Sequence, residues 1–207
     1  MTEEIANLDR KAPPDRPVSY DEFLAWSGGE QYAEWVDGVV LPSPPPTAQH
    51  QDLVAFFMCA LRDHCEESAG GRVFFSGYQT RLADVGRGRE PDVMCVGPER
   101  CHLVTEMYLD GAPDLAIEIV QAETRLIDRG AKYTEYEMSG VKEYWIIDPE
   151  IRRADFFVLV GDRYERRSPE TGSIITSTTV PGFWIDTEWL WQDQLPTQRQ
   201  MARLLRP

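Results

Sequence analysis

The chain has 207 residues, of which 42% are hydrophobic and 27% charged, and its net charge is −14. This composition is typical of a globular protein, and the length fits one domain with tails and a core large enough to fold without disulfides. No apolar run reaches the roughly 18 residues that a membrane span needs, and residues 1–5 carry acids where a signal peptide carries bases. We therefore expect a cytoplasmic protein whose four cysteines are buried and reduced.

The negative charge restricts the classes of partner. Phosphate contacts need Lys and Arg, so a net charge of −14 argues against non-specific binding to nucleic acid. The charge is a sum over the whole chain, however, and a local basic cleft can coexist with an acidic exterior. Clustered carboxylates also provide the oxygen ligands that a hard divalent cation needs.

Turn residues and apolar periodicity define the elements along the chain. Ser19 and Glu22 have the spacing of a capping box, which predicts the start of a short helix. Asp37-Gly38 between two extended apolar runs is typical of a type I′ hairpin turn. In chain order, the sequence predicts a flexible tail over 1–17, a helix over 19–27, a hairpin over 32–41, a helix over 47–68, strands over 73–77, 79–83, 92–96 and 114–120, a helix over 124–138, a strand over 143–148, a hairpin over 156–166 and a strand over 173–180.

This order of elements predicts one α/β (α+β) domain over residues 18–192, in which helices flank a mixed β-sheet and a helix and a hairpin come first. The last stretch, 193–207, is polar and predicts a C-terminal helix or tail. The aromatic residues before it, such as Phe183 and Trp184, either cover the core or form a dimer contact, and we expect them to cover the core. A homodimer is the default expectation for the assembly, because symmetric dimers are the commonest oligomers.

Glu118 is the most informative residue for function. It interrupts a near-continuous apolar run over 114–120, which is typical of a central strand covered on both faces. A charged carboxylate in such a strand is costly unless it is paired or binds a metal. One interpretation is therefore a buried structural salt bridge, and the other is a metal ligand.

Asp92 begins a second apolar strand, and a short acid at that place is often only a turn-former. If its strand lies beside that of Glu118, the two carboxylates become a pair of oxygen ligands. Two carboxylates with a main-chain carbonyl, here that of Ile119, are typical protein donors to Mg²⁺ or Mn²⁺. A metal held this way lowers the pKa of bound water and stabilises the charge of a phosphoryl transition state.

Lys132 lies on a predicted helix, with Asp128 one turn before it and Tyr136 one turn after it on the same face. One interpretation is a surface ion pair between Asp128 and Lys132. The other is that this face reaches the two carboxylates, where the ammonium would orient the attacking water or neutralise the developing phosphate charge.

Two further residues have open roles. Glu34, just before the Asp-Gly turn, is either a solvent-facing strand residue or a third acid of the site. His50 follows a proline-rich loop at the start of the long helix, and a lone histidine there is more often a structural hydrogen-bonding group than a catalyst.

These pieces, in this order, resemble the Uma2 family of proposed restriction endonucleases. The matching pieces are residues 32–38, the proline loop followed by His50, Pro91-Asp92-Val93, 112–120, 128–132 and 140–149, which together span roughly 18–190. The resemblance implies the restriction-endonuclease-like fold of the PD-(D/E)XK superfamily and metal-dependent hydrolysis of DNA. The usual motif has Lys two residues after the second acid, where this chain has Val120, and Lys132 matches the position from which the next helix can supply it. Family members often have Ser where Gln121 stands, a difference that the sequence does not explain.

The leading hypothesis is therefore a Mg²⁺-dependent or Mn²⁺-dependent DNA endonuclease in which Asp92, Glu118 and Lys132 form the site and Glu34 completes it. A second hypothesis is a non-catalytic binding or assembly module that keeps the nuclease fold, which the net charge of −14 favours. A third is a hydrolase of a smaller phosphodiester. A basic strip beside the acids would favour DNA, whereas a narrow closed pocket would favour a small substrate.

Overall fold

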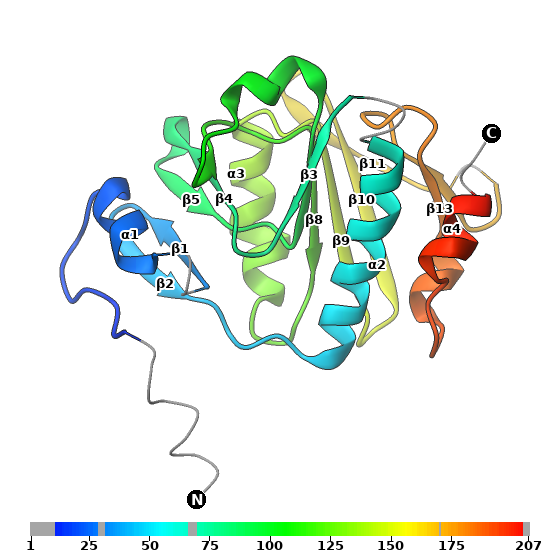
Figure 1. The fold of residues 1–207 in the computed structure, drawn as a ribbon, viewed down its shortest axis with the longest axis horizontal. Coiled ribbons are helices and arrows are strands. Elements are labelled where there is room, and N and C mark those ends of the chain that lie inside the picture. The colour runs from blue at the N-terminus through cyan, green and yellow to red at the C-terminus, as the bar shows by residue number, and fades with distance from the viewer. Residues whose placement is uncertain (1–10, 29–31, 66–69, 170, 205–207) are drawn as a thin grey trace, which may run out of the picture.

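The structure is a computed structural model that describes residues 11–28, 32–65, 70–169 and 171–204. The predicted mixed sheet flanked by helices, with a helix and a hairpin at the N-terminal end, is confirmed (Figure 1). Part of the predicted flexible tail, 1–10, lies outside the described residues, as do 66–69 of the predicted long helix. In the described part of the tail, the Ala12 carbonyl accepts a hydrogen bond from the Trp26 indole at 2.9 Å.

The main sheet has six strands in the order β11-β10-β9-β8-β6-β3. These strands are β3 (Arg72–Phe75), β6 (Val93–Val96), β8 (Leu115–Ile119), β9 (Glu143–Asp148), β10 (Arg153–Val160) and β11 (Arg163–Arg167). Strands β8 and β9 are parallel, and the other neighbours are antiparallel. A parallel pair needs a crossover connection, which the helical segment between β8 and β9 provides.

Helices cover both faces of this sheet (Figure 1). Helix α2 (Ala48–His64) packs Leu53, Phe57 and Leu61 into a cluster with Trp145 of β9. Helix α3 (Lys132–Met138) follows a π-helical turn, η5 (Ile127–Ala131), and packs Tyr136 against the neighbouring β9 residue, Tyr144. Successive residues of a strand point to opposite faces, so the two clusters lie on opposite sides of the sheet.

A second sheet of five strands, in the order β2-β1-β5-β4-β7, lies on the N-terminal side of the molecule. Its strands are β1 (Ala33–Val36), β2 (Val39–Pro42), β4 (Gln79–Leu82), β5 (Arg87–Arg89) and β7 (Tyr108–Leu109), and helix α1 (Tyr20–Ser27) packs on it. The capping box of α1 is present. Asp37 and Gly38 both have positive φ, 49° and 90°, as a type I′ turn requires, so both local predictions are confirmed.

The remaining elements are short. They are the 3₁₀ segments η3 (Ala83–Val85), η4 (Pro98–Leu103) and η6 (Thr187–Trp191), strands β12 (Ile174–Thr176) and β13 (Trp184–Asp186), and helix α4 (Gln198–Leu204). The predicted aromatic cover is confirmed, because Phe183 is fully buried and Trp184 packs against the α2-side core. No helix among the described residues is both long and apolar enough to cross a membrane.

The predicted strand over 173–180 is wrong beyond Thr176, because the chain turns there to surround the carboxylate of Glu143. Glu143 is 1% exposed, and its Oε2 accepts hydrogen bonds from the Ser177 hydroxyl at 2.8 Å and from the backbone and hydroxyl groups of Thr178 and Thr179. Its Oε1 accepts from the Trp145 indole at 2.8 Å. One buried acid at the start of β9 thus holds the C-terminal segment on the sheet.

Replacing Glu143 with Ala is expected to lower the free energy of unfolding by about 3 kcal/mol, because buried donors lose a charged acceptor. Urea unfolding of the purified variant measures this loss. Glu165→Ala is the matched control: Glu165 lies across β10 from Glu143, both pairing with Val158, but is exposed. A loss in Glu143→Ala no greater than in Glu165→Ala would contradict the assigned role.

The expectation of four reduced cysteines is wrong for one pair. Cys65 and Cys95 form a disulfide in the structure, whereas Cys59 and Cys101 are free. Both paired residues are buried where α2 packs on β6. Because the pairing joins residues 30 positions apart through the packing of a helix on a strand, no sequence spacing reveals it.

Candidate active site

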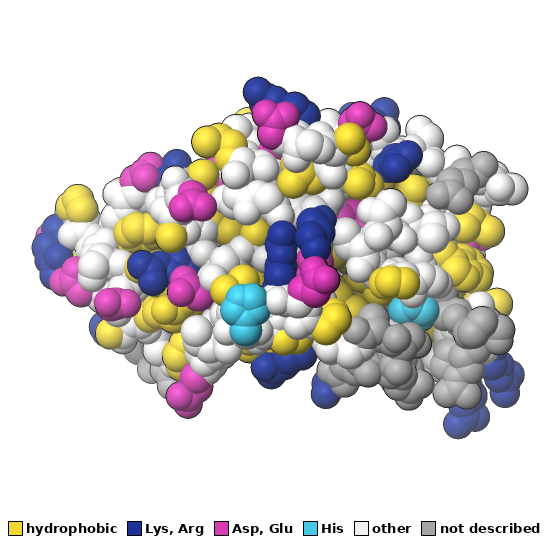
Figure 2. Space-filling view, turned by 90° about the horizontal axis from the view of Figure 1, so that it is seen from above, with side chains coloured by type: hydrophobic (Ala, Val, Ile, Leu, Met, Phe, Trp, Pro, Cys, Tyr) yellow, Lys and Arg dark blue, Asp and Glu magenta, His cyan; other side chains and the backbone are white. Residues whose placement is uncertain are grey.

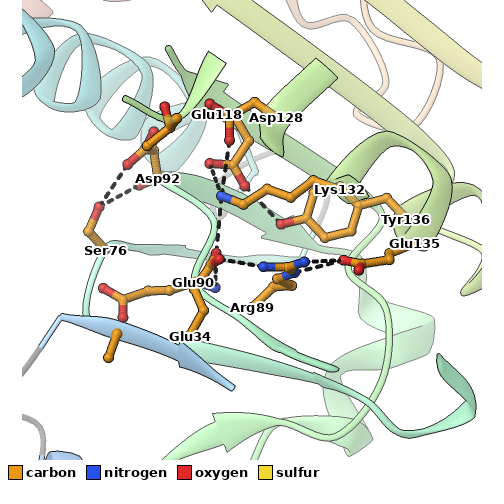
Figure 3. Close-up of polar contacts among 12 residues, drawn as sticks. Glu34, Ser76, Arg89, Glu90, Asp92, Glu118, Asp128, Lys132, Glu135 and Tyr136 are labelled. Carbon is orange, nitrogen blue, oxygen red and sulfur yellow. Dashed lines mark hydrogen bonds and ion pairs between the residues drawn. The ribbon is translucent and has the colours of Figure 1, made fainter. Parts of the chain in front are cut away.

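A pocket of about 120 Å³ lies where β8 ends, among the start of α2, the β1–β2 hairpin and η5. Five acids, one lysine and one histidine line it together with neutral residues. The charged and titratable lining residues are Glu34, His50, Glu90, Asp92, Glu118, Asp128 and Lys132. Figure 3 shows Lys132 reaching toward Glu34, Glu118 and Asp128, which come from separate segments of the chain.

Asp92 lies at this pocket because of the strand register. Val93 of β6 pairs with Ile117 of β8, which places Asp92 opposite Glu118. Asp92 Oδ2 accepts a hydrogen bond from the Ile119 backbone N–H at 2.7 Å, and its Oδ1 lies 3.3 Å from the Ser76 hydroxyl. The N–H and C=O of one strand residue point to the same side, so the Ile119 carbonyl lies on the side of Asp92.

Glu118 is 2% exposed and faces the α3 side of the sheet. Its Oε1 accepts a hydrogen bond from the Tyr136 hydroxyl at 2.8 Å, and its Oε2 lies 3.0 Å from Lys132 Nζ. Burial raises the pKa of Glu118 well above its usual range, and the nearby carboxylates of Asp92 and Asp128 raise it further, against the opposing effect of Lys132. Burial and the neighbouring acids thus favour the protonated form of the Glu118 carboxyl group, whereas Lys132 favours its charged form.

Lys132 lies among three carboxylates. Its Nζ is 3.0 Å from Glu118, 3.1 Å from Glu34 and 3.3 Å from Asp128. Burial opposes the charge on Lys132, but these three neighbours hold its pKa well above the usual range, so it stays a cation. The interpretation as a surface ion pair is wrong, since the pair with Asp128 forms but both residues are buried.

Glu34 is buried, so the interpretation as a solvent-facing strand residue is wrong. Its Oε1 contacts Lys132, and its Oε2 lies 2.5 Å from Arg89 of β5. Burial alone would raise the pKa of Glu34, but Lys132 and Arg89 hold it below its usual range. Glu34 is thus a stable anion that fixes the lysine beside Glu118.

Sequence reasoning missed the residues that support Glu34. Arg89 is 2% exposed and also pairs with Glu135 of α3 at 2.6 Å, so it ties the N-terminal sheet to the helix that carries Lys132. Glu90 accepts hydrogen bonds from the Gly77 backbone and the Gln79 side chain, and burial raises its pKa to about 7. These residues belong to the charged run Arg-Gly-Arg-Glu just before Pro91-Asp92, and such a run is also typical of a surface loop.

The structure places His50 and Gln121, whose roles the sequence left open, at the same pocket. His50 is buried, and its Nε2 lies 3.1 Å from Asp92 Oδ1, while its Nδ1 makes no hydrogen bond. Gln121 accepts a hydrogen bond from the backbone N–H of Thr47, the N-cap of α2, at 2.9 Å. Gln121 thus connects the end of β8 to the start of α2, which gives it a structural role.

The donor set can be tested against a divalent cation. Across the part of the chain that the structure describes, no group of three or more His, Cys, Asp and Glu side chains is arranged to hold a metal. A metal here would depend on Asp92, Glu118, the Ile119 carbonyl and water, an all-oxygen set of the kind that Mg²⁺ accepts. The pocket has five acids against one lysine, so carboxylate oxygens are the main ligands that it could offer a dication.

Comparison with known proteins identifies the family and the fold of this chain. The family model Uma2, described as "Putative restriction endonuclease", matches residues 20–188. The chain belongs to the Uma2 family. A crystal structure of "a putative nuclease belonging to DUF820" from Anabaena variabilis ATCC 29413 superposes with a TM-score of 0.70 at 16% identity, over 84% of this Uma2 chain and 98% of that one. This likeness establishes a common fold, and no curated protein matches the chain.

The sequence pieces that resemble the Uma2 family converge on the pocket. Glu34, His50, Asp92, Glu118 and Lys132 come from five separate segments of the chain and all line it. The nitrogen of Lys132 reaches Glu118 from the helix after β8 rather than from β8 itself. In this Uma2 protein, Val120 stands where the usual motif has lysine, but Lys132 still lies within ion-pair distance of Glu118.

Proposed function

We propose that this Uma2 protein is a divalent-metal-dependent endonuclease that hydrolyses phosphodiester bonds of DNA. The observation that carries the proposal is the contact of the Lys132 ammonium with Glu118, 3.0 Å apart, in the pocket where Asp92 lies opposite Glu118. Two carboxylates and a cation in one pocket provide metal ligands and a group that stabilises negative charge. The family description and the nuclease-like fold support the same chemistry.

Each residue has a role in this proposal. Asp92, Glu118 and the Ile119 carbonyl would hold Mg²⁺ or Mn²⁺, which when bound supplies an activated water and Lewis-acid stabilisation of the phosphoryl group. Lys132 donates from its ammonium to the attacking water or to the phosphate oxygen that gains charge. Glu34, held by Arg89, fixes the position of Lys132.

The test is incubation of the purified protein with supercoiled plasmid in Mg²⁺ or Mn²⁺, with EDTA as the control. We expect nicked or linear DNA only when the metal is present. Absence of hydrolysis of plasmid, linear duplex and single-stranded DNA with either metal would contradict the proposal. That result would favour the non-catalytic module, which the net charge of −14 also favours.

A further inference from the structure

Four arginines gather on two buried aspartates beside the pocket. They are Arg125 and Arg129, from the helical segment after β8, and Arg153 and Arg166, from β10 and β11, and we call them the arginine ridge. Arg153 and Arg166 each lie 2.8 Å from Asp155, which Arg129 also contacts. Arg125 lies 2.9 Å from Asp148, which is completely buried.

The arginine ridge continues the face of the sheet on which Glu118 lies. Every second residue of a strand lies on the same face, so Asp148 lies on the face of Tyr144, and Asp155 on the face of Phe157. Tyr144 and Phe157 both pack on the α3 side. Arg166 pairs with Phe157 across β10 and β11 and therefore lies on this face too. Strand β10 is two strands from β8 in the sheet, which is roughly 10 Å. The helical segment joins the two regions directly, since Thr124, Ile127 and Asp128 line the pocket and Arg125 and Arg129 alternate with them.

The charge of the ridge has the opposite sign to that of the chain. Its four arginines contact three acids, Asp148, Glu150 and Asp155, in a protein whose net charge is −14. Figure 2 shows that on the face it presents Lys and Arg side chains are interspersed with Asp and Glu. The ridge therefore provides a local basic strip of the kind that a phosphate backbone needs.

Two arginines of the ridge are both exposed to solvent and fixed in position, which favours binding of an anion. The side chains of Arg153 and Arg166 are 53% and 59% exposed, while the carboxylate that fixes them is 1% exposed. Each guanidinium has five N–H donors, and Asp155 accepts from only some of them. Arginines held in place by a buried carboxylate lose less side-chain freedom on binding an anion than free ones would.

We propose that the arginine ridge binds the phosphate backbone of the nucleic-acid strand that enters the pocket. The inference rests on the proposed endonuclease function and names the surface that positions the substrate. Phosphates of the strand lie on Arg153 and Arg166 while the scissile phosphate lies at Asp92 and Glu118. This arrangement explains how an acidic protein with an acidic pocket binds a polyanion.

The test is binding of a fluorescent DNA duplex and single strand, without metal, over a series of salt concentrations. Arg153→Gln with Arg166→Gln is expected to weaken binding at least about tenfold and to make the slope of log K against log salt shallower by about 2. Arg163→Gln is the matched control, because Arg163 is on the same strand as Arg166 but pairs with the buried Glu137 of α3 rather than with Asp155. It should bind DNA as the wild type does.

The outcomes separate this inference from the function. Unchanged binding by the double variant, equal weakening by Arg163→Gln, or no binding of DNA by the wild type would each overturn it. If the double variant does not fold, Arg166→Gln alone is used, since Asp155 keeps two arginines. Wild-type DNA binding that depends on the ridge, without hydrolysis of DNA or of bis(4-nitrophenyl) phosphate in Mn²⁺, would support the inference and refute the endonuclease.

Discussion

Replacing Asp92 with Asn is expected to lower metal-dependent DNA cleavage by about 10²–10³-fold or more, because one of the two carboxylates that would hold the metal loses its charge. The asparagine keeps the size of the side chain and an oxygen that can accept the hydrogen bond from Ile119 N–H. The free energy of unfolding should therefore fall by less than about 2 kcal/mol. Initial cleavage rates and urea unfolding of the same preparations measure the two effects.

Asp110→Asn is the matched control for this variant. It makes the same chemical change at a half-exposed aspartate whose ion pair with Arg81 spans 3.8 Å. Its cleavage rate should equal that of the wild type. An Asp92→Asn protein that cuts at the rate of the control would remove Asp92 from the site.

Replacing Lys132 with Met is expected to affect both activity and stability. Cleavage should fall by about 10²–10³-fold, since the ammonium that stabilises the developing charge is lost. Three buried carboxylates, those of Glu34, Glu118 and Asp128, also lose their shared cation, which should cost about 3–5 kcal/mol of unfolding free energy at neutral pH. Lys142→Met is the control, because Lys142 is 45% exposed and its partner, the buried Asp114, keeps its contacts with Arg100 and the Gly97 N–H. It should cost less than about 1 kcal/mol.

The loss of stability in Lys132→Met should depend on pH in a defined direction. Burial already raises the pKa values of Glu118 and Asp128, and removal of the cation raises them further. A carboxyl group whose pKa is higher in the folded state binds protons more tightly there, so its contribution is favourable at low pH and is lost as the pH rises through the folded-state pKa. The difference in unfolding free energy between wild type and variant should therefore narrow as the pH falls to where the variant binds more protons than the wild type. A difference that is constant with pH would contradict the assigned burial of these acids.

Local signals predicted much of the fold. The capping box at Ser19, the Asp-Gly turn and the apolar run around Glu118 each depend on neighbouring residues, and each gave the observed element. The strands β5, β7 and β13 were not predicted, because they are two or three residues long and their stability comes from pairing with distant strands. The strand over 173–180 failed for a related reason, since Glu143, whose carboxylate binds the turn after Thr176, lies 34 residues from Ser177.

The sequence pointed to the main acids and the lysine of the candidate site, but not to the contacts between them. Glu118 was found because a charge in an apolar strand needs an explanation. Lys132 was found because it shares a helix face with Asp128 and Tyr136, and the resemblance to the Uma2 family then matched it to the motif lysine. That Asp92 lies opposite Glu118 depends on the register of β6 against β8, which no local pattern contains. No local pattern contains the contacts of Arg89 either, because Glu34 lies 55 positions from it and Glu135 lies 46. The homodimer stays a prediction, which sedimentation of the purified protein would test.

The most direct test of the central claim is a calorimetric titration of Mn²⁺ into the wild type beside Asp92→Asn and Glu118→Gln, with and without a DNA duplex that carries a non-hydrolysable phosphate analogue. Including the duplex covers the case in which the metal binds only together with a substrate phosphate. The proposed site predicts saturable binding to the wild type that both variants lose, while Asp110→Asn keeps it. Equal Mn²⁺ binding by wild type and both variants, or none by the wild type with the duplex present, would contradict a metal-dependent nuclease built on Asp92 and Glu118.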